Sequence, residues 1–407
     1  RYSMHRLLLV MVLFALGAAL AAGACSAGGA SFDDDDDNDD ATTTGGGGDI
    51  GFDAGSGDAG LAGDPKTCQE AEIAKTYMGC DFWPTVTANN VWSVFDYAVV
   101  VANTGDNIVD ATVTRGGNPT ASAQIQPNSL QTIYLPWVPE LKGVDTDMFG
   151  TAIPMTESVR VPAGAYNLVT NFPVTVYQFN ALEYVGQGGP AGKNWTNCPG
   201  LISGIGCYSF SNDASLLIPS TVWTGNYRVT SIPGWQAANM GGFVAITGLQ
   251  DGTTVNIHLS ATADILAGGG LNATAAGQTA TTTIGRGEVI EVLSSATADM
   301  SGTWVEATAP VQVISGIPCR FIPDDQQACD HLEESVFPAE TLGQHYFVTR
   351  PTGPNGAAAG HFVRIYGNVD GTTLSYPAGQ PPVAPTTIGA GQVVDLGVVN
   401  MDFEIEG

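Results

Sequence analysis

The stretches "GFVAITGLQDGTTVNI" (residues 242–257) and "HFVRIYGNVDGTTLSY" (residues 361–376) are two versions of one pattern, 119 residues apart. Each consists of two strand-like runs separated by an Asp-Gly pair, and such residues mark turns between strands. Phe243 and Asp251 of the earlier version become Phe362 and Asp370 in the later one. The shared spacing indicates that a structural unit occurs twice.

The same repeat extends in both directions along the chain. Upstream, "IPSTVWTGNYRVT" (218–230) aligns with "FPAETLGQHYFVT" (337–349) at the same offset of 119 residues. Downstream, "IGRGEVIEV" (284–292) matches "IGAGQVVDL" (388–396) after a shorter insert. Chance rarely preserves one register over several segments, so the sequence contains an internal repeat.

The repeated unit is predicted to be built of β-strands. Runs such as "YAVVVANTG" (97–105) and "VTVYQFN" (174–180) are rich in β-branched residues, alternate with period two and end at turn residues. The stretch "CQEAEIAKTYMGC" (68–80) is the one short helix candidate. We therefore predict an all-β chain of tandem antiparallel β-sandwich-like repeats, each about the size of an immunoglobulin-like domain. A β-propeller with two blades per copy is the alternative.

A more diverged first copy runs from "YAVVVANTG" to "PVTVYQFNA" (173–181), and its end resembles "PVQVISGIP" (310–318). The third copy reaches Gly407 before any such closing strand, so we expect the sequence to be part of a longer one. The predicted division is a lipoprotein-type signal peptide at 1–25, a disordered Asp/Gly-rich tether at 26–66, a first β-rich repeat at 67–210, a second at 211–329 and a third, truncated repeat at 330–407.

The beginning of the sequence predicts export. Basic residues precede an apolar run from Leu7 to Ala22, and small residues then lead to Cys25, as in a bacterial lipobox. We predict that Cys25 is the lipid anchor of an outer-membrane or cell-surface lipoprotein whose contact with the membrane is through lipid only. An uncleaved transmembrane anchor is the alternative. The following tether contains few bulky apolar residues and cannot offset the entropy of ordering.

The charge balance excludes nucleic acid as a partner. The chain has 13 Lys and Arg against 40 Asp and Glu. Eleven of the acids and three of the bases precede Thr67, which leaves 29 acids and 10 bases in the rest of the chain. Phosphate binding requires clustered Lys and Arg. This charge is compatible with cationic surfaces or divalent ions, and solubility is the default explanation.

Seven cysteines are present, and six remain if Cys25 carries lipid. In an exported chain an even number of cysteines is typical of disulfide bonds. Six cysteines allow fifteen pairings, and pairing between close neighbours costs the least loop-closure entropy. The predicted disulfide cysteines form three such pairs: Cys68 with Cys80, Cys198 with Cys207, and Cys319 with Cys329.

The sequence "CRFIPDDQQACDHLEESVFP" (319–338) is the densest mixture of possible ligands. Its residues Asp330, His331, Glu333 and Glu334 are weak candidates for a cation or partner site, and no metal site is predicted with them. At the offset of 119, the equivalent positions of repeat 2 do not hold these acids or the histidine, so the scaffold does not require them.

Catalytic motifs are not found, since the chain has no G-x-S-x-G, H-E-x-x-H, C-x-x-C or P-loop pattern. We therefore predict no enzymatic activity and no cofactor, with a secreted hydrolase as the remote alternative. Tryptophans in predicted loops, such as Trp195 and Trp235, could stack on sugars or anchor a protein partner. Packing within the fold is the alternative for these rings.

Several segments together resemble one known family. They occur in the order "YMGCDFWP" (77–84), "YAVVVANTG", "PVTVYQFNALE" (173–183), "SNDASLLIP" (211–219), "DGTTVNI" (251–257), "PVQVISGIPC" (310–319) and "CDHLEE" (329–334). This ordered set is similar to the N-terminal domain of the IgG Fc-binding protein family, as in myxobacterial-type surface lipoproteins, over roughly residues 68–407.

The resemblance implies an extracellular binding or adhesion module without known catalysis, whose partner is a protein or a glycan surface. It does not imply that this chain binds IgG. A structural envelope or spacer lipoprotein without a specific ligand is the alternative function.

Overall fold

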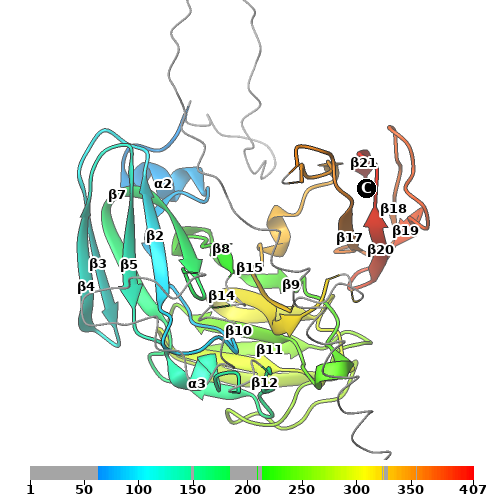
Figure 1. The fold of residues 1–407 in the computed structure, drawn as a ribbon, viewed down its shortest axis with the longest axis horizontal. Coiled ribbons are helices and arrows are strands. Elements are labelled where there is room, and N and C mark those ends of the chain that lie inside the picture. Colours follow the sequence, from blue (N-terminus) through cyan, green and yellow to red (C-terminus); the bar gives the residue numbers. More distant parts are fainter. Residues whose placement is uncertain are drawn as a thin grey trace, which may run out of the picture. The chain divides into compact units, whose positions relative to one another are not determined.

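A computed structural model describes residues 63–147, 151–183, 209, 213–322, 324, 329–353 and 355–407. The predicted signal peptide and nearly all of the tether lie outside these residues. The described chain is nearly all β and antiparallel, as predicted (Figure 1). Its two α-helices are α2 (Cys68–Ala74) and α3 (Pro139–Lys142), and neither is long enough to cross a bilayer.

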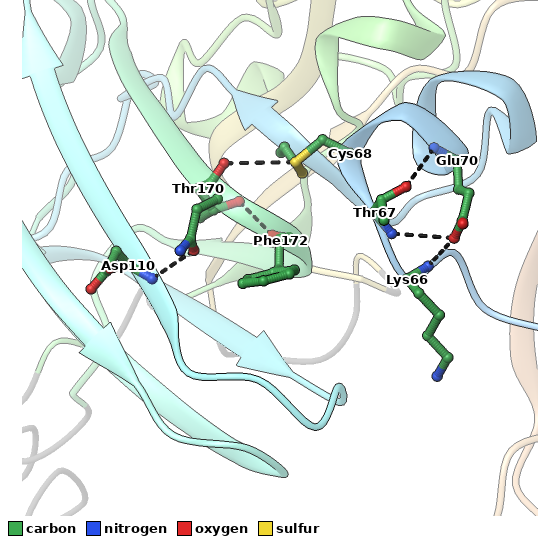
Figure 2. The surroundings of a disulfide bond; sticks show 9 residues. Lys66, Thr67, Cys68, Glu70, Asp110, Thr170 and Phe172 are labelled. Carbon is green, nitrogen blue, oxygen red and sulfur yellow. Dashed lines mark hydrogen bonds between the residues drawn. A yellow bond between two sulfur atoms is a disulfide. The ribbon is translucent and has the colours of Figure 1, made fainter.

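Helix α2 is the one short helix that the sequence predicted, and local contacts cap its N-terminus (Figure 2). The Thr67 hydroxyl accepts a hydrogen bond from the Glu70 N–H at 3.2 Å, and the Glu70 carboxylate accepts one from the Thr67 N–H at 3.2 Å. This reciprocal capping box satisfies backbone donors that the first turn would otherwise leave free. The disulfide between Cys68 and Cys80 ties the helix to the following strand β1 (Gly79–Phe82).

The first sheet is organised around one long strand, β7. The first half of β7 pairs with β1 and β3, and the second half pairs with β2 and β8. The strand order is β4-β3-β7-β2-β5. Besides β1, the strands of this sheet are β2 (Tyr97–Asn103), β3 (Val109–Arg115), β4 (Asn118–Ile125), β5 (Ser129–Leu135), β7 (Tyr166–Phe179) and β8 (Ala214–Leu216).

The second sheet repeats this plan around β14. Its order is β12-β11-β14-β10-β13-β6, and β9 and β15 also pair with β14. Apart from β6, each strand therefore has a counterpart in the first sheet. The strands are β6 (Val159–Val161), β9 (Thr224–Arg228), β10 (Phe243–Gly248), β11 (Thr253–His258), β12 (Thr279–Ile284), β13 (Val289–Leu293), β14 (Trp304–Arg320) and β15 (Asp330–Ser335).

The third copy contains three strand pairs: β16 with β21, β17 with β20, and β18 with β19. Each pairing has its equivalent in the second sheet, namely β9 with β14, β10 with β13, and β11 with β12. The strands are β16 (His345–Val348), β17 (His361–Tyr366), β18 (Thr372–Thr373), β19 (Thr387–Ile388), β20 (Val393–Val399) and β21 (Phe403–Glu406).

The repeat predicted from the sequence extends to individual hydrogen bonds. The Tyr227 hydroxyl accepts from the Thr224 N–H at 3.1 Å, and the equivalent Tyr346 hydroxyl accepts from the Gly343 N–H at 2.7 Å. The conserved spacing also holds at the Asp-Gly turns, where each aspartate accepts a backbone hydrogen bond from across the unit. The Asp251 carboxylate accepts from Arg286, and the Asp370 carboxylate accepts from Ala390. A short 3-10 turn follows the equivalent prolines Pro219 and Pro338, and these turns are η1 (Ser220–Val222) and η3 (Ala339–Thr341).

The segment between β1 and β2 joins the first two sheets. Residues 83–91 form no regular strand, and all of them are buried. Gln312 of β14 donates to the Trp83 carbonyl at 2.9 Å, and the Thr85 hydroxyl lies 3.2 Å from the Thr247 hydroxyl of β10. Its apolar residues Trp83, Val86 and Ala88 belong to the core that both sheets share. Its polar residues make hydrogen bonds across the junction.

The third copy is anchored on the second by Arg364 of β17. Its guanidinium donates to Asp299 at 2.6 Å, to the Ser231 carbonyl at 2.6 Å and to the Ser301 hydroxyl at 2.9 Å. Arg364 and Asp299 are both largely buried. Charge-assisted hydrogen bonds of this kind are roughly twice as strong as neutral ones.

Removal of the Cys319–Cys329 bond should weaken the fold at the start of the third copy. This pairing is as predicted, and it closes a loop of 10 residues in sequence separation. In the chain-entropy model, a disulfide that closes a loop of this size stabilises the folded state by somewhat under about 3 kcal/mol. Cys319→Ala/Cys329→Ala should lower the free energy of unfolding by about that amount in denaturant titrations.

Peptide mapping without reductant provides the control for this measurement. A linked peptide containing Cys319 and Cys329 is expected from the unchanged chain. Recovery of both as free thiols, or an unchanged denaturation midpoint in the double variant, would show that the bond does not stabilise the protein.

Candidate functional site

The weak cation candidates Asp330, His331, Glu333 and Glu334 all lie on β15. Successive side chains of a strand point to opposite faces. His331 and Glu333 therefore point to the interior, where they are 1% and 4% exposed, whereas Asp330 and Glu334 face outward. The four candidates are close together in sequence, but the strand directs two of them to the interior and two to the surface.

The Glu333 carboxyl is the centre of a buried hydrogen-bond network. Gln178 and Ser215 each donate to its Oε1 at 2.6 Å, and Asn180 donates to Oε2 at 2.7 Å. The hydroxyl of Thr87 donates to the same Oε2. These donors come from β7 and the residue that follows it, from β8 and from the buried segment 83–91, so the carboxyl joins elements of different copies.

A second carboxyl and the histidine complete this cluster. The Asp213 carboxylate accepts a hydrogen bond from the Glu333 N–H at 2.7 Å. His331 stacks on Phe243, with ring centroids 5.9 Å apart, and its Nε2 lies 3.4 Å from the Thr87 hydroxyl. Its Nδ1 is 3.8 Å from Asp213 Oδ2. The ring is thus held between the two sheets by packing and one long polar contact.

Burial controls the protonation of this cluster. It raises the pKa of Glu333 to about 7, although its hydrogen-bond donors oppose the shift. Burial and the neighbouring Glu333 raise the pKa of Asp213 to about 7, and burial and Asp213 raise that of Glu334 to about 7. Burial lowers the pKa of His331 to about 3. His331 is therefore neutral near pH 7, and its contact with Asp213 is not an ion pair.

The arrangement around Glu333 is suited to holding strands together. Both carboxyl oxygens are used as acceptors and the side chain is buried, so no face of it is presented to a solute. Within the described ranges, His345, Glu404 and Glu406 are the three side chains whose ligand atoms lie within 4.8 Å of one another. They lie on β16 and β21, away from β15, and His345 is exposed.

Two of the three predicted disulfides are confirmed, Cys68–Cys80 and Cys319–Cys329. Cys198 and Cys207 lie outside the described residues, as does the predicted lipid anchor Cys25. The confirmed bonds each close a short loop next to a strand, at β1 and at β15. They therefore act as structural connections beside these strands.

The described tryptophans pack within the fold. Trp83 and Trp223 are buried and lie 6.5 Å apart between ring centroids. Trp235 is half-buried against Phe321 at 4.5 Å, and Trp304 stacks on His258 at 4.6 Å. Trp195 lies outside the described residues. These rings support the packing interpretation for the described part of the chain.

A groove of about 490 Å³ opens in the third copy. Its apolar lining is contributed mainly by β16, β17 and β21. Pockets of this size and character are typical of binding sites. The lining side chains that give it this character are Tyr346, Val348, Val363, Ile365, Phe403 and Ile405.

Large apolar side chains are also exposed around the groove. Val369, at its rim, is 63% exposed, and Phe362 of β17 is 41% exposed. In the second copy the equivalent of Phe362 is Phe243, which is fully buried. The third copy thus presents apolar surface at positions that the second copy covers.

Sequence reasoning did not identify this groove. Its residues match the second copy in pattern, and no ligand-like residue type marks them. The available signal was the alignment itself, because the counterpart of "PVQVISG" (310–316) is absent from residues 361–407.

Glu333→Gln should reduce the pH dependence of stability. The folded pKa of Glu333 is about 7 and its ordinary value is 4.5, so the folded state holds the proton more tightly. The resulting stability is fully present below about pH 4.5 and is lost as the pH rises to about 7. The substitution should remove up to about 3 kcal/mol of the loss between pH 5 and 7.5.

Urea titrations at pH 5 and 7.5 measure how the free energy of unfolding changes with pH. The matched control is Glu140→Gln, because Glu140 is exposed. The comparison uses the change with pH within each protein, so a general loss of stability in Glu333→Gln does not affect it. Equal pH dependence in all three proteins would mean that Glu333 titrates as an ordinary glutamate.

In the comparison with known proteins, residues 213–405 match the model of the family described as IgGFc binding protein. The match begins just before β8 and ends in β21, so it spans the second and third copies, including the groove. No curated protein and no solved structure matches the chain. The match confirms the resemblance that the ordered motifs predicted: residues 213–405 of this chain are similar to the IgGFc binding protein family.

Proposed function

We propose that the chain is an exported binding and adhesion module that holds an extracellular protein through the groove of the third copy. The proposal is supported by the family match over residues 213–405 and by the position of the groove within the matched region. The family match carries the proposal, because it covers the second and third copies, in which the groove lies.

The lining favours a protein partner over a glycan. Tyr346, Val363, Ile365 and Phe403 supply mainly apolar contact surface, whereas the polar groups of a glycan would need hydrogen-bond partners along the groove. Aromatic and aliphatic side chains are typical of the centres of protein interfaces. A glycan partner is the alternative within the same proposal.

Cell-surface location follows from features outside the described residues. A lipid at Cys25 would attach the chain to the membrane, and the acidic segment 26–66 would separate the binding copies from it. An unstructured segment of about 40 residues, as the sequence predicts for 26–66, would have an r.m.s. reach of about 35 Å. This distance would let the folded copies meet partners beyond the membrane surface.

We further propose that the role is binding rather than catalysis. The support is that Glu333 and His331, the residues closest to an acid–base pair, are buried and engaged in structural contacts. A general acid or base must be within hydrogen-bond reach of its substrate. A passive spacer lipoprotein without a specific ligand is the alternative function.

Charge placed in the groove should abolish binding. Val369→Asp changes an exposed rim residue with little risk to the fold, and Ile365→Asp changes the groove wall. Leu130→Asp on β5, where Leu130 is 70% exposed, is the matched control. Both groove variants should reduce saturable retention of extracellular proteins by the immobilised chain at least about tenfold, since a charge must be desolvated there.

Retention is measured with a native extracellular fraction and with the same fraction after proteinase digestion. Thermal unfolding establishes that each variant is folded. Equal retention by Leu130→Asp and Val369→Asp would contradict the groove as the binding site. Retention that survives digestion would replace the protein partner with a glycan.

A further inference from the structure

The first two sheets are in contact where β15 lies against β8. Glu333 of β15 donates its backbone N–H to the Asp213 carboxylate at 2.7 Å, and the Ser335 hydroxyl donates to the Leu216 carbonyl at 2.7 Å. The Ser215 hydroxyl of β8 donates to the Glu333 carboxyl. Each of these bonds uses a side chain, because the backbone of β15 pairs with β14 and that of β8 pairs with β7.

Titratable groups surround this contact, and most of them are acids. The carboxyl groups are those of Asp213 before β8, Glu291 of β13, and Asp330, Glu333 and Glu334 of β15. His331 lies on the same face of β15 as Glu333, and the Tyr97 hydroxyl of β2 reaches Glu333 through Gln178. The ion pairs that Lys and Arg form within the described residues all lie elsewhere. The described part of the contact thus holds several acids without a basic partner.

Two of these carboxyls are buried so deeply that their charge would be costly. Glu333 is 4% exposed and Glu291 is fully buried. One Glu291 oxygen accepts from the Ala88 N–H at 2.8 Å, and the other has no hydrogen-bond partner among the described residues. A buried carboxylate that is not paired with a base becomes neutral by taking up a proton. The closed contact therefore favours protonated carboxyls.

The network around Glu333 can hold a proton without moving its heavy atoms. The Thr87 hydroxyl is hydrogen-bonded to Glu333 Oε2 and lies 3.4 Å from His331 Nε2. A hydroxyl group can both donate and accept. When Glu333 is protonated, its Oε2 can donate to Thr87, which then donates to the neutral His331. When Glu333 is ionised, Thr87 donates to the carboxylate instead.

We propose that the contact between β8 and β15 is a pH-dependent latch, which is closed while Asp213 and Glu333 are protonated and opens when both ionise. This inference goes beyond the proposed binding function and does not depend on it. Two neighbouring negative charges repel each other and are hydrated more easily in the open state. β15 stays paired with β14, and the apolar core that the sheets share does not titrate, so the opening is confined to this contact.

The direction of the pH dependence follows from the two carboxyls. Burial and the nearby Glu333 raise the pKa of Asp213 from 3.8 to about 7, and burial raises that of Glu333 from 4.5 to about 7. The closed latch therefore holds the protons more tightly than the open one. Its stability is fully present below the ordinary pKa values and is lost as the pH rises to about 7. Each carboxyl shifts the opening equilibrium by up to about tenfold per pH unit in this window.

Hydrogen exchange of the full chain at pH 5 and 7.5 measures the opening. The reporter peptides cover residues 213–218 and 330–335, and the reference peptides cover β11 and β12, at the other side of the second sheet. The ratio of reporter to reference at one pH removes the intrinsic pH dependence of amide exchange. The protection of the reporters relative to the reference should fall at least about tenfold from the lower to the higher pH.

Variants of the two carboxyls identify the cause of this fall. Asp213→Asn/Glu333→Gln should remove it, because neither side chain can ionise, and Asp213→Asn alone should reduce it. Glu72→Gln, at an exposed position of α2, is the matched control and should behave as the unchanged chain does. The single variant at Asp213, which is only partly buried, keeps the test decisive if the double variant does not fold.

Three results would overturn the latch. The first is a ratio that stays the same at both pH values in the unchanged chain. The second is a loss of protection that is equal in reporter and reference peptides, since it would show that the whole fold opens. The third is a fall that is as steep in Asp213→Asn as in the unchanged chain.

Discussion

The buried carboxyl of Glu333 is the constraint on which the arrangement of the copies depends. Four hydrogen bonds converge on its two oxygens, from β7 and the residue that follows it, from β8 and from the segment 83–91. Removing one partner of a buried polar group destabilises the fold by more than the net stabilisation from that hydrogen bond, because the remaining group is buried and cannot be hydrated again. The donors and the carboxyl therefore fix one another, and the junction between the sheets has one satisfied arrangement.

The repeat was the part of the fold that sequence could predict in detail. The offset of 119 residues aligns Tyr227 with Tyr346 and Asp251 with Asp370, and in both cases the side-chain hydrogen bond recurs with the residue. These bonds are local to one unit, so the same sequence signal produces the same structure twice. The disulfide between Cys319 and Cys329 was predictable for the same reason, because its partners are close along the chain.

Contacts between different repeat units could not be predicted from local sequence patterns. The acids of β15 form one group in the sequence, yet the period of a strand directs Glu333 inward and Glu334 outward. The donors to Glu333 lie 118 to 246 residues away, and no local pattern marks Ser215 or Thr87 as its partners. Residues 83–91 are buried without regular structure because they fill the space between sheets, a role that has no periodic signature.

The position of β15 shows how one copy is joined to the next. β15 belongs by sequence to the third repeat, but it pairs with β14 of the second sheet; β8 likewise precedes the second sheet and pairs with β7 of the first. Each sheet is thus completed by a strand that follows it in the chain. Neighbouring copies are therefore joined by backbone hydrogen bonds between strands as well as by side chains. Glu333 stabilises this exchange, because its hydrogen bonds hold β15 against the first sheet and the segment 83–91.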